Sequence, residues 1–521
     1  MGATEDMDEQ RQNAAMAGEP NAIFKAVVRS ARRAPDAVAI RFANRRWNYA
    51  ELVAAAVAFA DELTRRGVHG GDRVAVLGRN SDAYVIAFLA VQYLGAIHIP
   101  INFMLREQEV SYILNHCAPR VIFTDEEFLL VAQAAVAAAE PHVDCLTLRI
   151  PTSFKPFDFG EDGREMAERP RPAQIAYTSG TESAPKGALL SDQGLVHQYM
   201  SCIAVGEYLE SDIVVHALPL YHCAQLHCFL LPFLIIGSEN IILDRVDIAE
   251  VAETIRDTRA SSFFAPPTVW IGILGHPGFD PRKLSTLRKG YYGASIMPTK
   301  VINRMREQLP WLRFWNYYGQ TEIGPLATAL RPDEHAERPA SAGRAVLFVE
   351  TRIVDDDMRD VGPGKVGEIV HRSPQLLMRY YRDPEKTAAA FAGGWFHSGD
   401  LGTMDAQGFV TIVDRKKDII NSGGENVASR EVEEAIYRHP AVDEVAVVGL
   451  PDPKWVERVC AAIVLKADTV ATSDDILKAC AHLASFKRPK QITFVERLPK
   501  NPSGKILKRE LRVSLSESMT T

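Results

Sequence analysis

The stretch that decides the fold reads AQIAYTSGTESAPKG and covers residues 173–187. Its apolar start, residues 173–176, predicts a buried strand, and hydroxyl residues, glycine and Lys186 follow it directly. Small residues allow backbone N–H groups to close around phosphate oxygens, hydroxyls donate hydrogen bonds to them, and a lysine supplies positive charge. The stretch therefore predicts a phosphate-binding loop that follows a strand.

This loop does not have the Walker A pattern. Counted from Gly180, a Walker A loop has glycine before its lysine and serine or threonine after it, whereas Pro185 and Gly187 flank Lys186. The sequence therefore excludes a P-loop NTPase or a kinase of that type.

Length and composition set the class of protein. A chain of 521 residues predicts two or more domains, because single hydrophobic cores stop growing at roughly 250–300 residues. Hydrophobic residues make up 47% and charged residues 24%, the proportions of an ordinary globular enzyme. The net charge of -7 gives no basic excess, so the sequence predicts no nucleic-acid partner.

The sequence also predicts the compartment. Residues 1–20 lack a basic start followed by an apolar core, so we interpret them as a disordered lead and not as a secretory signal. The longest apolar run, residues 229–236, is too short to span a bilayer and indicates a buried strand or helix. The 7 cysteines have no CxxC pair and no metal-binding spacing, which favours free thiols in a reducing cytoplasm.

The pattern of predicted secondary structure changes once along the chain. The first half alternates helical patterns such as residues 52–65 with short β-rich runs such as 73–78 and 121–124, which predicts parallel α/β sheets. Near Asp414 a compact charge run appears, and a glycine-rich stretch and a helical pattern over residues 429–438 follow it. This change predicts a domain boundary and a small α+β domain after it.

The loop at 177–187 resembles the signature loop of the adenylate-forming superfamily, which comprises acyl-CoA synthetases, luciferases and peptide-synthetase adenylation domains. Further resemblances follow in the order of that family up to Lys505. They are LPLYH at 218–222, YGAS at 292–295, NYYGQTE at 316–322, SGD at 398–400, SGGEN at 422–426 and PSGK at 502–505.

The resemblance implies a fold and its limits. It implies a large N-terminal domain of layered α/β sheets with a distorted β-barrel subdomain, residues 21–416, after the disordered lead of residues 1–20. A small mobile α+β C-terminal domain, residues 417–521, would follow, with a hinge at Lys417 that rotates between two half-reactions.

It also implies a reaction. In this superfamily a carboxylate attacks the α-phosphate of ATP and expels pyrophosphate, and a thiol, often that of coenzyme A, then displaces AMP. Several anions must be held together while charge develops on phosphorus. ATP and Mg²⁺ are the implied cofactors, and coenzyme A is the implied co-substrate.

The resemblance assigns the β- and γ-phosphates of ATP to the first loop. The residues implied are Thr178, Ser179, Gly180, Thr181 and Lys186, with Thr181 also at the metal. The family usually has Thr-Gly where this chain has Glu182-Ser183. A carboxylate beside phosphates is unfavourable unless Mg²⁺ or Lys186 compensates its charge.

The central motifs imply the rest of the nucleotide site. His222 would line the acid pocket, and Thr321 would bond the α-phosphate. Glu322 would hold Mg²⁺, because carboxylate oxygen suits this hard cation. The residues implied at the adenine and ribose are Gly293, Ala294, Ser295, Tyr318, Gly319, Asp400 and Arg415.

Two C-terminal motifs complete the implied site. The loop of Ser422, Gly423, Gly424 and Glu425 would approach the pantetheine arm in the thioester step. Lys505 would reach the α-phosphate and the attacking carboxylate and stabilise the transition state by its charge.

Among the branches of the superfamily, the sequence favours a free-standing acyl-CoA synthetase. The chain ends Ser518-Met519-Thr520-Thr521 and lacks the Ser-Lys-Leu tail of most luciferases. No aspartate follows His222 as in amino-acid-activating modules.

Apolar residues after His222 favour a medium- or long-chain fatty acid as the small-molecule substrate. Three alternatives stay open: an aryl or cinnamic-type acid–CoA ligase, an acyl-AMP ligase that delivers to a carrier protein, and a nucleotide-binding protein without turnover. A homodimer also stays open.

Overall fold

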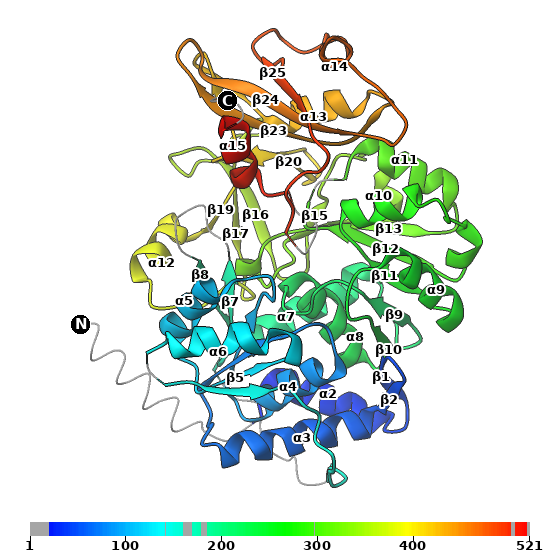
Figure 1. Ribbon diagram of the computed structural model, residues 1–521, viewed down its shortest axis with the longest axis vertical. Helices are drawn as coiled ribbons and strands as arrows, with labels where there is room; N and C mark the ends of the chain where they lie inside the picture. Colours follow the sequence, from blue (N-terminus) through cyan, green and yellow to red (C-terminus); the bar gives the residue numbers. More distant parts are fainter. Residues whose placement is uncertain are drawn as a thin grey trace.

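The computed structural model describes residues 20–140, 142–159, 169–178, 185–295, 297–501 and 506–517. Residues 1–19, most of the predicted disordered lead, lie outside this part of the chain. Figure 1 shows two parts, a large body that carries the N-terminal and central strands and a smaller part with the C-terminal strands above it. This architecture confirms the predicted α/β fold with a separate C-terminal domain. The exact domain limits stay a prediction.

A seven-stranded sheet carries the predicted phosphate-binding loop. Its strand order is β18-β8-β7-β4-β3-β5-β6. The strands from β7 to β6 run parallel, whereas β8 and β18 pair antiparallel at one edge. The bounds are β3 (Arg73–Leu77), β4 (Ile97–Ile101), β5 (Val121–Thr124), β6 (Asp144–Thr147), β7 (Pro172–Thr178), β8 (Lys186–Ser191) and β18 (Arg379–Tyr380).

A nine-stranded sheet lies beside it and carries the central motifs. Its order is β15-β14-β13-β12-β11-β9-β10-β1-β2. The six strands from β13 to β1 are parallel, and antiparallel strands flank them on both sides. The bounds are β1 (Val38–Phe42), β2 (Arg45–Asn48), β9 (Ile213–His216), β10 (Glu239–Ile242), β11 (Ser262–Phe264), β12 (Lys289–Gly293), β13 (Arg313–Tyr318), β14 (Thr328–Leu330) and β15 (Arg344–Ala345).

Both faces of this second sheet are buried. Successive side chains of its strands join two different hydrophobic clusters; Phe314 belongs to one and Trp315 to the other. A strand that alternates in this way packs helices on both sides, which explains its nearly continuous apolar sequence.

The helices that cover the two sheets begin and end where the sequence supplies caps. Asn48 and Glu51 form a capping box at the start of α3, and Gly67 with φ of 75° follows its end. The helices of the large body are α2 (Ala22–Arg33), α3 (Tyr49–Arg65), α4 (Asp82–Tyr93), α5 (Glu107–Cys117), α6 (Leu129–Ala137), α7 (Asp192–Gly206), α8 (Leu231–Ile236), α9 (Ile248–Thr258), α10 (Pro267–Gly275), α11 (Thr299–Gln308) and α12 (Pro384–Ala390).

Short helical turns connect these elements. Two of them matter for the site: a π-helix, η2 (Ala224–Leu230), leads into α8, and a 3-10 turn, η4 (Thr321–Ile323), follows β13. The others are η1 (Glu126–Phe128), η3 (Pro281–Leu284), η5 (Pro332–His335) and η6 (Ala392–Gly394).

An antiparallel four-stranded sheet represents the predicted distorted β-barrel subdomain. Its order is β16-β17-β19-β20, and its register shifts twice, in the pairing of β17 with β19 and of β19 with β20. The bounds are β16 (Glu350–Val354), β17 (Gly367–Arg372), β19 (Phe396–Met404) and β20 (Val410–Arg415).

The C-terminal part is a small α+β unit. Its five-stranded sheet has the order β22-β21-β24-β23, and β25 pairs parallel with β24. The bounds are β21 (Ile420–Ser422), β22 (Glu425–Val427), α13 (Ser429–Tyr437), β23 (Val442–Asp452), β24 (Val456–Leu465), α14 (Ser473–Ala479), β25 (Gln491–Phe494) and α15 (Lys508–Glu517).

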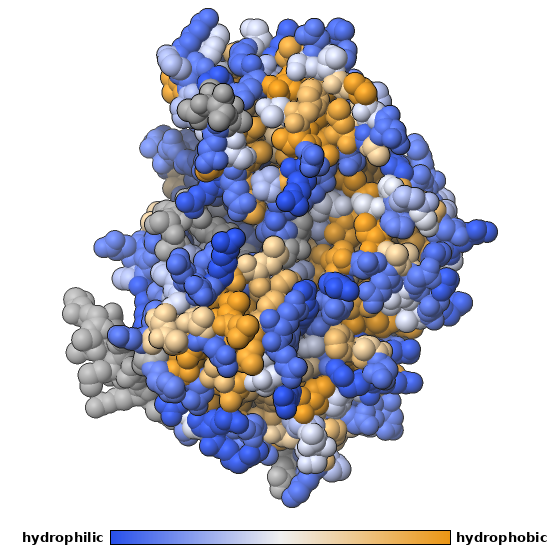
Figure 2. All heavy atoms as spheres, in the orientation of Figure 1, coloured by the Kyte–Doolittle hydropathy of each residue, from blue (hydrophilic) through white to orange (hydrophobic). Residues whose placement is uncertain are grey.

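The surface carries both polar and apolar areas. On the face drawn in Figure 2, apolar residues gather on the upper part and again on the large body below it. Among the described residues, none of the helices combines the length and the apolar character needed to cross a bilayer. All 7 cysteines are free thiols.

Candidate active site

The loop after β13 presents two of the predicted catalytic residues. Gly319 follows the strand, and a Cβ atom at this position would lie 2.0 Å from the carbonyl oxygen of Pro325, so only glycine fits. The Ala327 N–H donates to the Tyr318 carbonyl at 2.8 Å and closes the loop. Thr321 and Glu322 lie on η4 at the tip of this closed loop.

Three predicted nucleotide-binding residues from three strands meet in one cluster. The Tyr318 hydroxyl donates to Asp400 Oδ2 at 2.7 Å, and Arg415 Nε lies 3.4 Å from Asp400 Oδ1. Asp400 and Arg415 are register partners of β19 and β20. Burial, and next the Asp400 charge, raise the pKa of Tyr318 well above its usual value, so its phenol stays a neutral donor.

The residue that follows the motif at 218–222, Cys223, contacts the loop after β13 with its thiol. Cys223 Sγ lies 3.1 Å from Thr321 Oγ1, and His222 Nδ1 accepts from the Ala224 N–H at 3.2 Å. Burial raises the pKa of the Cys223 thiol to about 12, so it contacts Thr321 as a neutral group. The sequence predicted a free thiol here and gave no sign of this contact.

A network of buried, hydrogen-bonded side chains holds the π-helix η2 that follows Cys223. His227 Nδ1 lies 2.7 Å from the Tyr199 hydroxyl, and His227 Nε2 lies 3.2 Å from Gln174 Oε1. His98 Nδ1 reaches the same Gln174 oxygen at 3.1 Å. Burial lowers the pKa of His227 to about 3 and that of His98 to about 4, so both rings are neutral. These hydrogen bonds connect η2 to α7, β7 and β4.

The described ends of the phosphate-binding loop lie near Glu322. Thr178 and Lys186 are partners across β7 and β8, and Thr178 Oγ1 donates to the Lys186 carbonyl at 3.5 Å. Lys186 Nζ lies 5.7 Å from the ring centroid of Tyr380, and the Tyr380 hydroxyl donates to Glu322 Oε1 at 3.0 Å. The predicted residues Ser179, Gly180 and Thr181, and the unusual Glu182-Ser183, lie outside the described residues.

The predicted adenine segment has a structural reason for its glycine. A Cβ at Gly293 would lie 2.4 Å from the Tyr317 carbonyl oxygen of the neighbouring strand. Ala294 follows in a left-handed conformation with φ of 63° and, with Ser295, leaves the end of β12. The segment therefore lies beside the end of β13, where Tyr318 begins its loop.

The C-terminal glycine motif is a tight hairpin. Ser422 and Glu425 are partners across β21 and β22, and Gly423 and Gly424 have φ of 69° and 91°. Two positive φ angles define a type I′ turn, which glycine adopts without strain. The Gly423 N–H donates to the Trp455 carbonyl at 2.6 Å. In the described part of the chain, hydrogen bonds from the hairpin to other segments reach Trp455 and Glu457 rather than Thr321 or Asp400.

Two further predicted residues stand at the C-terminal part. Lys417, the predicted hinge, lies exposed between β20 and β21, and partial desolvation followed by the charge of Arg415 lowers its pKa. Lys505 lies outside the described residues, but Lys500 and Ile506 on either side of it form an antiparallel bridge.

Several side chains around η4 gave no sequence signal. Gln375 donates from Nε2 to the carbonyls of Ile323 at 3.0 Å and Leu326 at 2.5 Å. Gln198 Oε1 accepts from the Leu326 N–H at 3.2 Å. Such contacts join segments far apart in the chain, and no local pattern marks them.

The predicted cluster thus lies together in the described structure, while the hairpin lies apart from it. Lys186 and Arg415 bring positive charge to this region, Thr321 brings a hydroxyl, and the buried Asp400 carboxylate contacts both Tyr318 and Arg415. The arrangement suits the transfer of a nucleotide to a carboxylate.

Comparisons with known proteins give the same family. Residues 27–381 match the family described as AMP-binding enzyme, and residues 431–505 match the AMP-binding enzyme C-terminal domain. The chain is 35% identical to a feruloyl-CoA synthase of Amycolatopsis sp, over 93% of this chain and 97% of that protein. It is 31% identical to a long-chain-fatty-acid–CoA ligase of Bacillus subtilis, over 94% of each chain.

A solved structure agrees with these relatives. The anthranilate CoA ligase AuaEII in complex with anthranoyl-AMP matches with a TM-score of 0.87 and 26% identity, over 95% of this chain and 98% of that chain. The chain therefore belongs to the AMP-binding enzyme family of the adenylate-forming superfamily, and it is an AMP-forming acid–thiol ligase that uses ATP and coenzyme A.

Proposed function

We propose that the enzyme joins an aromatic carboxylic acid, of the aryl or cinnamic type, to coenzyme A. The observation that carries the proposal is the aromatic packing around the π-helix that follows Cys223. Phe229 of η2 stacks on Phe264 with ring centroids 4.2 Å apart and on Tyr317 at 5.7 Å. Flat buried rings of this kind give a rigid wall against which a planar substrate can stack.

The relatives support the same class. A feruloyl-CoA synthase and an anthranilate CoA ligase are named for aromatic acids. Polar side chains lie close to these aromatic rings. His227 and Phe229 both belong to η2, and Tyr199 of α7 contacts His227.

A medium- or long-chain fatty acid, which the sequence favoured, is the second candidate. The relative from Bacillus subtilis acts on long-chain fatty acids by its name. The apolar residues of η2 and α8 suit an alkyl chain as well as a ring.

We assign roles to the clustered residues by their geometry. Lys186 and Thr321 would hold phosphate oxygens, and Lys505 would reach the α-phosphate. Asp400 would accept the ribose hydroxyls beside Arg415. In this arrangement the Tyr318 hydroxyl donates to one Asp400 oxygen.

The donor set fits Mg²⁺ only when phosphate oxygens complete it. Among the described residues, no group of three or more His, Cys, Asp or Glu side chains could hold a metal ion. Glu322 and the neighbouring Thr321 hydroxyl offer oxygen ligands, as Mg²⁺ prefers, and ATP would supply the others. When bound, Mg²⁺ neutralises charge on the phosphates.

The protein's own residues would then act in sequence. Lys186 and Thr321 orient the triphosphate, and the acid meets the α-phosphate beside His222 and Cys223. Lys505 stabilises the charge that develops as pyrophosphate leaves. The hairpin of Gly423 and Gly424 would guide the thiol that displaces AMP.

Acid-dependent release of pyrophosphate from ATP tests this proposal. The panel would contain ferulate, cinnamate, benzoate, anthranilate, octanoate and palmitate, each with and without coenzyme A. We expect fastest release with a cinnamic-type acid and acceleration by coenzyme A. Preference for palmitate would select the second candidate, and release without an effect of coenzyme A would point to a carrier-protein acceptor. No release with any acid would contradict the proposed function.

A further inference from the structure

One short segment joins the two sheets that form the candidate site. We call residues 373–381 the strap. On one side it pairs with the seven-stranded sheet: the Met378 N–H donates to the Leu189 carbonyl at 2.8 Å, and the Tyr381 N–H donates to the Gly187 carbonyl at 2.7 Å. β18, which lies within the strap, is the partner of β8.

On its other side the strap holds the loop that follows the nine-stranded sheet. Gln375, which is 2% exposed, donates to the carbonyls of Ile323 and Leu326. The Leu377 N–H donates to the Glu322 carbonyl at 2.7 Å. The backbone around Glu322 is therefore fixed by the same segment that is fixed to β8.

Tyr380 extends this link to side chains. It is 8% exposed, and its hydroxyl donates to Glu322 Oε1 at 3.0 Å. Its ring lies 5.7 Å from Lys186 Nζ, within the range of a cation–π contact. One residue thus touches a carboxylate from one sheet and an ammonium group from the other.

We propose that Tyr380 is a positioning residue that fixes Glu322 relative to Lys186, so that both meet the phosphates of ATP in one geometry. The inference rests on the proposed function, which places these two residues at the triphosphate. The phenol donates to one carboxylate oxygen and restricts the Glu322 side chain to orientations that keep this bond. Such preorganisation removes the cost of ordering the carboxylate when ATP binds.

The first test compares two neighbouring tyrosines. Tyr380→Phe removes the hydroxyl and keeps the ring beside Lys186. Tyr381→Phe is the matched control, since its backbone N–H and therefore its bond to Gly187 remain. We expect Tyr380→Phe to slow adenylate formation about tenfold, the effect of one lost hydrogen bond to a charged group. Thioester formation from supplied acyl adenylate should change less than about twofold in both variants.

The second test measures ATP binding without any acid. Isothermal titration of ATP with Mg²⁺ would use wild type, Tyr380→Phe, Glu322→Gln and the double variant. If Tyr380 acts through Glu322, Tyr380→Phe weakens binding about fivefold in wild type and less than about twofold in the Glu322→Gln background.

Three results would overturn the inference. They are equal behaviour of Tyr380→Phe and Tyr381→Phe, full additivity in the double variant, and loss of both half-reactions together with a lower unfolding temperature. Because the titration needs no acid, it decides the inference even if no acid in the panel releases pyrophosphate. Absence of pyrophosphate release with every acid would count against the proposed function alone.

Discussion

Some contacts at the candidate site could be predicted from the sequence, and others could not. Tyr318 and Asp400 stand in short local motifs that the resemblance assigns to one nucleotide, and the structure places them in contact. Tyr380 contacts Glu322 across 58 positions, and Cys223 contacts Thr321 across 98. These two contacts depend on how separate sheets pack, and a single sequence does not register that packing.

Lys505 provides a prediction at this scale. Lys505→Ala should abolish adenylate formation and spare thioester formation from supplied acyl adenylate, because its charge would act only while the α-phosphate is attacked. The matched control is Lys500→Ala, since Lys500 forms an ion pair with Glu444. Adenylate formation by this control should change less than about twofold. Single-turnover assays of each half-reaction measure both effects, and equal loss of both halves in Lys505→Ala would reject the assigned role.

Among the elements, the hairpin of β21 and β22 shows where sequence and structure give different reasons for the same residues. The glycines indicated a loop that lets a pantetheine arm come close. The structure gives a local reason as well, since both glycines need positive φ angles for the turn. The element was therefore predictable, while its function in the thioester step stays a prediction.

The hairpin yields a prediction with a built-in control. Gly424→Leu should block thioester formation and leave adenylate formation within about twofold, because the added side chain would stand at the tip of the turn. Gly408→Leu carries the same kind of backbone strain, with φ of 82° against 91°, and neither position has a neighbour within 4 Å. Each variant should lose about 1–2 kcal/mol of stability. A fall of adenylate formation in Gly424→Leu alone would show that the hairpin has another role.

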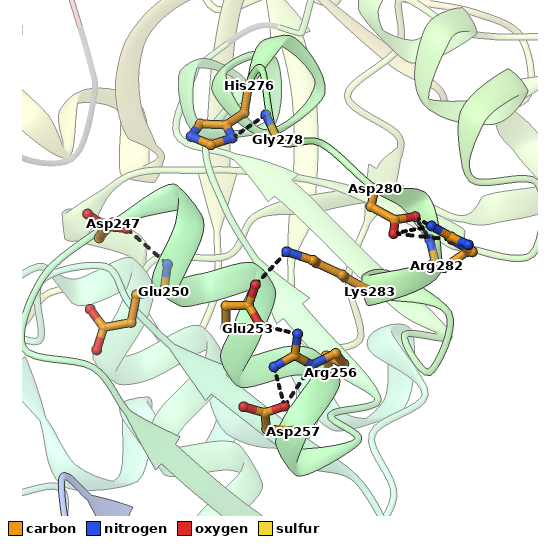
Figure 3. A network of polar contacts seen from close by, with 10 residues as sticks. All are labelled: Asp247, Glu250, Glu253, Arg256, Asp257, His276, Gly278, Asp280, Arg282 and Lys283. Carbon is orange, nitrogen blue, oxygen red and sulfur yellow. Dashed lines mark hydrogen bonds and ion pairs between the residues drawn. The ribbon is translucent and has the colours of Figure 1, made fainter.

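Ion pairs at element ends allow a second comparison. The pair of Lys289 and Asp212 is buried, with 8% and 5% of the side chains exposed and the charged atoms 2.6 Å apart. Around α9 and η3, an exposed network joins Glu253 to Lys283 and Arg256 (Figure 3). Asp212→Asn should cost about 3 kcal/mol, because it leaves a buried ammonium group without its counter-ion.

Glu253→Gln is the matched change in the exposed network. It should cost less than about 1 kcal/mol, because water and salt screen that network. Urea unfolding at neutral pH measures both values. Similar losses for the two variants would contradict the assigned difference in burial.

For the whole molecule, the sequence predicted the α/β class, the two-part organisation and the family. It did not predict the strand order, since β1 pairs with β10 and brings Ile40 beside Asn240. It also left residues 229–236 undecided between strand and helix; the structure has the end of a π-helix and then α8 there. Apolar runs of this length carry no distinguishing period.

Buried histidines predict a pH dependence of global stability. Burial lowers the pKa of His98, His216 and His371 to about 4 and that of His227 to about 3. The folded values lie below the unfolded value of about 6.5, so the unfolded chain binds more protons as pH falls. Stability is retained above about pH 6.5 and is lost between there and about pH 4. Each histidine contributes up to about 1.4 kcal/mol per pH unit.

Unfolding midpoints measured in urea from pH 7.5 to 5 check this slope. His98→Gln, which removes one of these groups, should flatten the dependence. A midpoint that stays constant over this range would contradict the neutral buried histidines.

The π-helix η2 has a consequence for chain length itself. A π-helical turn holds one residue more than an α-helical turn, so the spacing between Cys223 and α8 depends on that extra residue. Deleting Gln225 should return the segment to an α-helix and rotate Cys223 by about 100° away from Thr321, which a thiol–hydroxyl contact cannot survive. Thiol-labelling rates at Cys223 would report the rotation. Here the number of residues, as much as their identity, specifies where the Cys223 thiol lies relative to Thr321.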